Sequence, residues 1–206
     1  NPVAGLITSE GGGTATFDVT LVSQPTADVM IALSSDTPAE GSPSPASLTF
    51  SAANWNTPQT VTVTGANDFV ADGTISYQIV LAAASSADLG YDGQDPADVA
   101  VSNTDDDVAG ISVVPVAGLV TTEAGGSAGF DIVLTSQPTA DVVIPVASDN
   151  AAEGTVSAAS LTFTAANWNV AQTVTVTGVD DAVQDGDIAY GIVVGAATST
   201  DANYSG

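Results

Sequence analysis

Residues 47–65 read SLTFSAANWNTPQTVTVTG, and residues 160–178 read SLTFTAANWNVAQTVTVTG. The two stretches are 113 residues apart, and shifting the whole chain by that distance aligns it with itself without a gap. Of the 93 aligned positions, 58 are identical. A period of this kind indicates two copies of one structural unit, so the fold can be predicted from a single copy.

Within one copy, polar and apolar residues alternate with a period of two, as in TATFDVTL at residues 14–21 and QTVTVT at residues 59–64. Such alternation predicts half-buried β-strands, and no helical stripe is visible. Gly, Pro, Asn and Asp separate the further strands that we expect at residues 28–33, 47–50, 75–81 and 98–101. The sequence therefore predicts an all-β protein, built from two tandem Greek-key, immunoglobulin-like β-sandwiches of about seven strands each.

The repeat also predicts the domain limits, with repeat 1 at residues 1–107 and repeat 2 at residues 108–206. The segment at residues 94–113, QDPADVAVSNTDDDVAGISV, stands between the two copies and occurs once. Repeat 1 has no counterpart of residues 108–113 and so lacks its first strand. Repeat 2 reaches only Gly206, the equivalent of Gly93, and so lacks its last strand. We interpret the chain as a window from a longer tandem array.

The composition restricts the possible partners. The 206 residues include 20 Asp and 4 Glu but no Lys, Arg or His, which gives a formal charge of −24, and 44% are hydrophobic, as in a globular protein. No side chain can neutralise phosphate, so we expect no nucleic acid and no anionic membrane surface as a partner. No apolar run is long enough for membrane insertion. Cations are the partners that this chain favours.

Catalysis has little support in the sequence. General acid–base chemistry most often uses His, and covalent catalysis uses an activated Ser, Cys or Lys beside a base. Without His, Cys, Lys or Arg, only a carboxylate pair remains, as in glycoside hydrolysis. Acids duplicated in equivalent loops are more typical of two equal binding sites. We therefore predict that the protein is not an enzyme.

The acidic residues in loops are candidate metal ligands. In a Greek-key sandwich, the loops after the first, third and fifth strands lie at one end, and the last strand finishes there too. The acids of these loops should therefore converge. The candidates in repeat 1 are Glu10, Asp36, Asp68, Asp72, Asp105, Asp106 and Asp107, and those in repeat 2 are Glu123, Asp149, Asp180, Asp181 and Asp185.

Such a cluster needs a counter-charge. Two unit charges about 5 Å apart repel by roughly 3 kcal/mol at an effective dielectric constant near 20, and the chain has no basic side chain to offset this. Ca²⁺ takes six to eight oxygen ligands, whereas Mg²⁺ prefers a tighter octahedron and Zn²⁺ prefers His or Cys. The sequence thus favours calcium. The alternative is a solvated acidic end that keeps the protein soluble.

These residues carry a resemblance to a known family. The sequence resembles the Calx-beta domains, which are β-sandwiches, in the order of four features. These are TSEGG at residues 8–12, a loop Asp, an acidic turn after a strand and a terminal DDD at residues 105–107. The resemblance implies a Calx-beta-type sandwich with two or more Ca²⁺ ions clustered at its distal end. Asn67 stands where the family has an acid, whereas the equivalent position of repeat 2 is the acid Asp180. The repeat style is similar to that of giant bacterial surface adhesins and extracellular fibres.

Three functional hypotheses follow. In the first, the chain is a non-enzymatic structural repeat of a secreted or cell-surface protein, a rod that calcium stiffens and that serves as an adhesin spacer. In the second, it is a subunit of an extracellular filament whose subunits, or neighbouring repeats, complete one another by strand donation. In the third, it binds surface glycans, with Trp55 or Trp168 as a stacking platform, although a Trp at this position more often caps the core. All three predict an extracellular location, on a bacterial cell surface.

Overall fold

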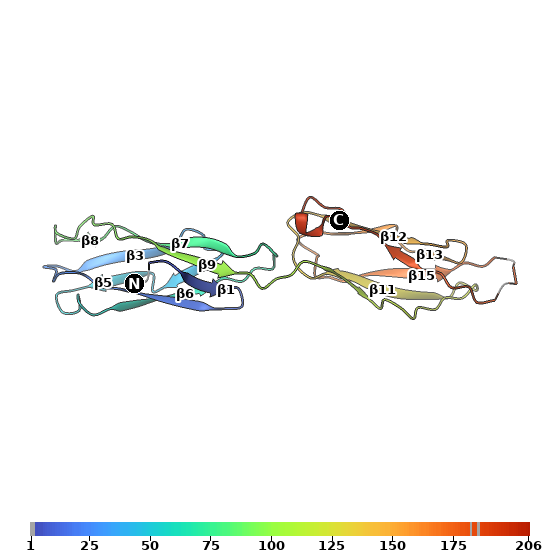
Figure 1. Ribbon diagram of the computed structural model, residues 1–206, viewed down its shortest axis with the longest axis horizontal. Helices are drawn as coiled ribbons and strands as arrows, with labels where there is room; N and C mark the ends of the chain where they lie inside the picture. The colour runs from blue at the N-terminus through green and yellow to red at the C-terminus, as the bar shows by residue number, and fades with distance from the viewer. Residues whose placement is uncertain (1–2, 182, 185) are drawn as a thin grey trace. The chain divides into compact units, whose positions relative to one another are not determined.

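The computed structural model describes residues 3–181, 183–184 and 186–206. They form two compact units (Figure 1). Unit 1 comprises Asn1–Asp68 with Asp72–Asp106, and unit 2 comprises Phe69–Ala71 with Asp107–Gly206. Within the described residues, the regular structure consists of β-strands and one short 3-10 turn at Ala202–Tyr204. The predicted all-β fold is confirmed.

Unit 1 is a sandwich of two sheets. The larger sheet has the order β1-β9-β7-β3-β5, with β8 beside β3, and the smaller one has the order β2-β6-β4. The strands are β1 (Leu6–Ser9), β2 (Thr14–Val19), β3 (Val29–Ser35), β4 (Gly41–Ser44), β5 (Ser47–Phe50), β6 (Gln59–Gly65), β7 (Ile75–Leu81), β8 (Ser85–Ser86) and β9 (Val99–Thr104).

Strand β9 lies between β1 and β7 in the larger sheet. It pairs in parallel with β1 and antiparallel with β7, so both of its edges are hydrogen-bonded. Val99 and Val101 are each 2% exposed and belong to the core, since alternate residues of a strand point to the same face. The core of unit 1 therefore depends on a strand that comes late in the repeat.

Unit 2 repeats this plan with differences. One sheet has the order β10-β11-β15-β13 and the other β14-β12-β16. The pairs β2–β6 and β11–β15 have the same register, because Phe17 lies opposite Val61 and Phe130 lies opposite Val174. The strands are β10 (Ile111–Val114), β11 (Ser127–Leu134), β12 (Val142–Ser148), β13 (Gly154–Val156), β14 (Ser160–Phe163), β15 (Gln172–Gly178) and β16 (Ile192–Val194).

The predicted strand positions agree closely with the structure where apolar residues alternate. Strands β5 and β7 have the predicted bounds, whereas β9 continues three residues beyond the predicted end, to Thr104. Strand β4 was not predicted, because its sequence GSPS has no apolar alternation and contains Pro43. It pairs only with β6, at the edge of its sheet, where Pro is tolerated.

Trp168 packs against the core of unit 2, in keeping with a role as a core cap. The residues that the structure describes contain no helix suited to crossing a membrane.

Candidate metal site

Parallel pairing brings acidic residues together at one end of unit 1. Ser9 and Thr104 are register partners at the ends of β1 and β9, and the amide of Glu10 donates a hydrogen bond of 3.0 Å to the carbonyl of Thr104. Glu10 and the triplet that begins at Asp105 therefore leave the sheet side by side. The loop after β6 contributes Asp68, so that acids from three of the predicted segments lie close together.

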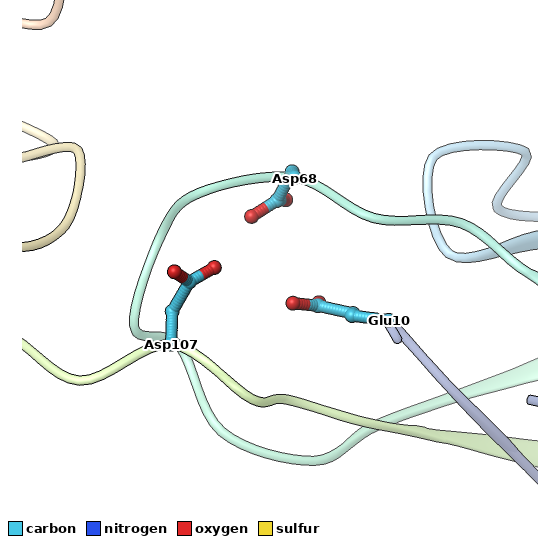
Figure 2. Close-up of side chains that lie close together, drawn as sticks. All are labelled: Glu10, Asp68 and Asp107. Atoms are coloured by element: carbon cyan, nitrogen blue, oxygen red, sulfur yellow. The ribbon is translucent and has the colours of Figure 1, made fainter. Parts of the chain in front are cut away.

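Two groups of carboxylates form there. In the first group, one carboxylate oxygen each from Glu10, Asp68 and Asp107 lie within 4.8 Å of one another, and Figure 2 shows the three side chains directed at a common space. The second group consists of Glu40, Asp68 and Asp72, and one carboxylate oxygen of each again lies within 4.8 Å of the others. Asp68 belongs to both. We refer to them as the Glu10 group and the Glu40 group.

The two glutamates are buried, Glu10 with 4% of its surface exposed and Glu40 with 7%. For Glu40, desolvation raises the pKa, a hydrogen bond from Asn103 opposes this, and the charges of Asp72, Asp68 and Asp105 raise it further, so that the pKa lies above its ordinary value. Ionised carboxylates are thus held in an environment that disfavours their charge.

The pKa of Asp72 is also raised. Desolvation and the neighbouring charges of Asp68 and Asp105 raise it, even though the side chain remains exposed, and a hydrogen bond from its own backbone lowers it. Asp105 in turn accepts a hydrogen bond of 2.7 Å from the amide of Gly73, which fixes the loop that carries Asp72.

A buried polar network supports the Glu40 group. The side chain of Asn103 accepts a hydrogen bond of 2.9 Å from the hydroxyl of Thr8 and donates one of 3.0 Å to the carbonyl of Ala66. Its amide nitrogen also lies 3.5 Å from Oε2 of Glu40. The hydroxyl of Thr8 is 3.2 Å from that of Tyr77. Because these groups are buried and hydrogen-bonded to one another, they hold Glu40 in one position.

The structure places other predicted ligands elsewhere. Asp36 is exposed and accepts a hydrogen bond of 2.9 Å from the amide of Gln78, and its counterpart Asp149 accepts one of 2.7 Å from the amide of Gly191. Among the described residues, neither these two nor Asp106 belongs to a group of three acids. For them, metal binding stays a prediction.

In the described part of unit 2, no three acids come together in the same way. Glu123 and Asp180 are exposed, and Asp181 accepts a hydrogen bond of 2.7 Å from the amide of Val183. Asp185 lies outside the described residues. The aspartate triplet at residues 105–107 follows β9 of the first repeat.

The predicted ligand set omits Glu40, which the structure places in the site. A signal for it exists in the sequence, because all four Glu of this Asp-rich chain occur at paired positions of the repeat, and Glu40 pairs with Glu153. The pattern does not show that the chain turns between Asp36 and Glu40. Because of this turn, Asp36 faces the backbone of β7, whereas Glu40 faces the acids.

The donor set consists of carboxylate oxygens alone, which suits a hard cation and is compatible with Ca²⁺. No neighbouring ammonium, guanidinium or imidazole group can serve instead, since the sequence has no Lys, Arg or His.

Comparison with known proteins yields structural likeness only. No protein-family model and no curated protein matches the chain. Among solved structures, the calcium-binding domains CBD12 of CALX1.2 are 14% identical with a TM-score of 0.40, covering 98% of this chain and 81% of that one. CBD12 of CALX1.1 is 15% identical with a TM-score of 0.42, covering 95% and 78%. The periplasmic chaperone SfaE is 11% identical with a TM-score of 0.40, covering 93% and 97%. Since calcium-binding domains and chaperones match to the same degree, this likeness decides neither family nor function.

Proposed function

We propose that the chain is a calcium-binding, non-enzymatic structural repeat of a secreted or cell-surface protein. The observation that supports this proposal is the pair of carboxylate groups that share Asp68 and include the buried Glu10 and Glu40. In a chain without basic side chains, such groups need a bound cation.

The charges account for the choice of ion. Each pair of carboxylates at this spacing repels by roughly 3 kcal/mol at an effective dielectric constant near 20. Ca²⁺ offsets this with six to eight oxygen ligands and tolerates irregular geometry, whereas Mg²⁺ demands a regular octahedron. In the proposed arrangement, the Glu10 group and the Glu40 group each contribute to one Ca²⁺ site, and Asp68 bridges the two.

The position in the sequence suggests a mechanical role. Asp107 is separated by three residues from Ile111, where β10 begins. An ion held by Glu10, Asp68 and Asp107 fixes the start of this short connection and so stiffens a tandem array, as an adhesin spacer requires. Extracellular modules bind calcium at about 10⁻⁴ to 10⁻³ M, which agrees with an extracellular location on a bacterial cell surface. Small-angle scattering with and without Ca²⁺ measures the stiffening, and identical curves would argue against this role.

A thermal melt tests calcium binding. We expect millimolar CaCl₂ to raise the Tm of unit 1 above its value in EGTA, because a ligand at 100 times its dissociation constant adds about 2.7 kcal/mol per site, while MgCl₂ has a smaller effect. Asp68→Asn should abolish most of the shift, since both groups lose a ligand.

The matched control is Asp181→Asn, the same change at the equivalent position of repeat 2, where no group forms. It should leave the calcium shift of unit 1 intact. Equal melting curves in Ca²⁺ and EGTA for the unaltered chain would refute the proposal and leave the acidic end as a solvated surface.

A further inference from the structure

We propose that unit 2 is a strand acceptor: it binds an extended segment of the sequence type found at residues 94–107, in a groove that β9 fills in unit 1. The groove has a volume of about 1200 Å³. Residues 115–123 line one side and residues 186–194 line the other, with Phe130 and Val176 between them. This inference stands on packing and does not depend on calcium.

The repeat itself supplies the comparison. The residues that β9 covers in unit 1 are buried, and their counterparts in unit 2, 113 positions later, are only half-buried. The sequence does not explain the difference, because four of the five pairs are identical in residue type and the fifth exchanges Leu for Val. The pairs are Leu6 and Leu119, Thr8 and Thr121, Tyr77 and Tyr190, Ile79 and Ile192, and Leu81 and Val194.

The backbone differs in the same place. In unit 1, β1 and β7 flank β9 and bond to it along their length. In unit 2, residues 119–121 belong to no strand, and of the counterpart of β7 only Ile192–Val194 is a strand, paired with β12 on its other side. Two segments of β-type sequence thus border an open groove, and a sheet edge of this kind pairs readily with an added strand.

The pairing in unit 1 predicts the register of the occupant. Val101 lies opposite both Leu6 and Tyr77, Val99 lies opposite Ile79, and Asn103 lies opposite Thr8. Transferred by 113 residues, the occupant's second Val therefore faces Leu119 and Tyr190, and its first Val faces Ile192.

The polar end of the groove matches this register. The hydroxyl of Thr121 is 2.6 Å from that of Tyr190, as Thr8 and Tyr77 are neighbours in unit 1, where Asn103 completes the contact. An occupant with the pattern Val-x-Val-x-Asn places two apolar side chains in the groove and the Asn beside Thr121. The acids that follow the Asn come to lie near Glu123.

A second copy of the chain is a poor donor. Its own segment of this type, β9, is already paired on both edges, and Val99 and Val101 are part of its core. Donation from there requires unit 1 to open. The occupant that we propose is therefore a segment of this sequence that is not yet part of a sheet.

A labelled peptide with the sequence of residues 94–107, QDPADVAVSNTDDD, tests this on the full chain in EGTA. We expect saturable binding at one peptide per chain by fluorescence anisotropy, and slower amide exchange at residues 119–122 and 188–194. The control peptide carries Val99→Ser and Val101→Ser. It loses two buried apolar side chains and should bind at least about 100-fold more weakly.

A second variant keeps the test decisive. Appending residues 94–107 after Gly206 should fill the groove from within, slow the same amides and abolish binding of the added peptide, and an extension of scrambled sequence should do neither. Equal binding of both peptides, or no binding of the first, would overturn the proposal. So would a dimer in light scattering whose groove amides are protected before any peptide is added, because a second copy would then be the occupant.

Calcium is varied separately. Binding in EGTA reports on strand acceptance alone, and stronger binding on addition of CaCl₂ reports on an ion held by the peptide's aspartates with the acids of unit 2. Failure of one result leaves the other unaffected.

Discussion

Asn103 shows how a single side chain connects the core of unit 1 with its acidic end. It is 1% exposed, and its amide reaches the hydroxyl of Thr8, the carbonyl of Ala66 and the carboxylate of Glu40. A buried amide with these partners is favourable only while all of them stay in place. The position of Glu40, and with it the Glu40 group, therefore depends on a residue that binds no metal itself.

We expect Asn103→Leu to destabilise unit 1 by about 1–3 kcal/mol, because a buried hydroxyl, a carbonyl and a carboxylate each lose a partner. Urea unfolding in EGTA measures the change. Ser102→Ala is the control, since Ser102 is the neighbouring position of β9 and its hydroxyl lies 3.3 Å from that of Ser76, near the surface. A loss that is the same for both variants would contradict this role of Asn103.

Glu40 predicts an unusual response to pH. Its pKa in the fold lies above the ordinary value of 4.5, so between these two values the folded protein holds a proton that the unfolded chain has released. The free energy of unfolding therefore falls as the pH rises through this window and recovers as the pH is lowered. Without calcium, mild acid should raise the Tm of unit 1.

Glu40→Gln isolates this effect. In EGTA at neutral pH, the variant should melt higher than the unaltered chain, because a buried charge is gone, and its Tm should depend less on pH between neutral pH and the ordinary carboxyl value of 4.5. Glu153→Gln, at the paired position of repeat 2, should leave unit 1 unchanged. Melts across this pH range decide the matter, and a Tm of the unaltered chain that falls steadily with acid would contradict the assignment.

At the scale of elements, the turn that follows β5 and β14 has the same construction in both units. Oδ1 of Asn54 accepts a hydrogen bond of 2.6 Å from the amide of Ser51, and Oδ1 of Asn167 accepts one of 2.6 Å from the amide of Thr164. In each case the hydroxyl of the same Ser or Thr donates a second bond of 3.1 Å. Asn side chains stabilise turns in this way, which explains why AANWN recurs unchanged.

We expect Asn54→Ala and Asn167→Ala to destabilise their own units by similar amounts, about 1–2 kcal/mol, since each removes the same two hydrogen bonds. Calorimetry should show that each variant lowers one transition and not the other. A somewhat larger loss for Asn54→Ala would reflect the further hydrogen bond of 3.3 Å that Nδ2 of Asn54 donates to the carbonyl of Thr49, whereas a larger loss for Asn167→Ala would contradict the expectation.

At the scale of the whole molecule, the two units differ in their cores although their sequences are similar. Among the residues that the structure describes, sixteen buried side chains form the core of unit 1 and twelve form that of unit 2. Fully burying an apolar side chain contributes about 1.5–3 kcal/mol, so a difference of this size exceeds the effect of most single substitutions.

Heating should therefore unfold the chain in two steps, with unit 2 unfolding first. Differential scanning calorimetry in EGTA and in CaCl₂ measures both transitions, and calcium should move only the upper one, because four of the five carboxylates of the two groups, all except Asp107, belong to unit 1. A single cooperative transition, or a lower transition that calcium shifts, would contradict this expectation.

The sequence by itself determined the repeat, the all-β class and most strands, because alternation with a period of two is a local property of residues such as 47–50 and 75–81. Of the twelve acids that it put forward, four are found in the two groups, and these four, Glu10, Asp68, Asp72 and Asp107, all follow strands whose ends meet. Only the tertiary structure decided that Glu40 joins them and that Asp36 does not, because the two are four residues apart in one loop and the direction of each depends on partners in β7 and β9. The same cause separates the units: residues 188–194 share the pattern of residues 75–81, yet only three of them form a strand, because a strand exists only beside a neighbour that satisfies its hydrogen bonds.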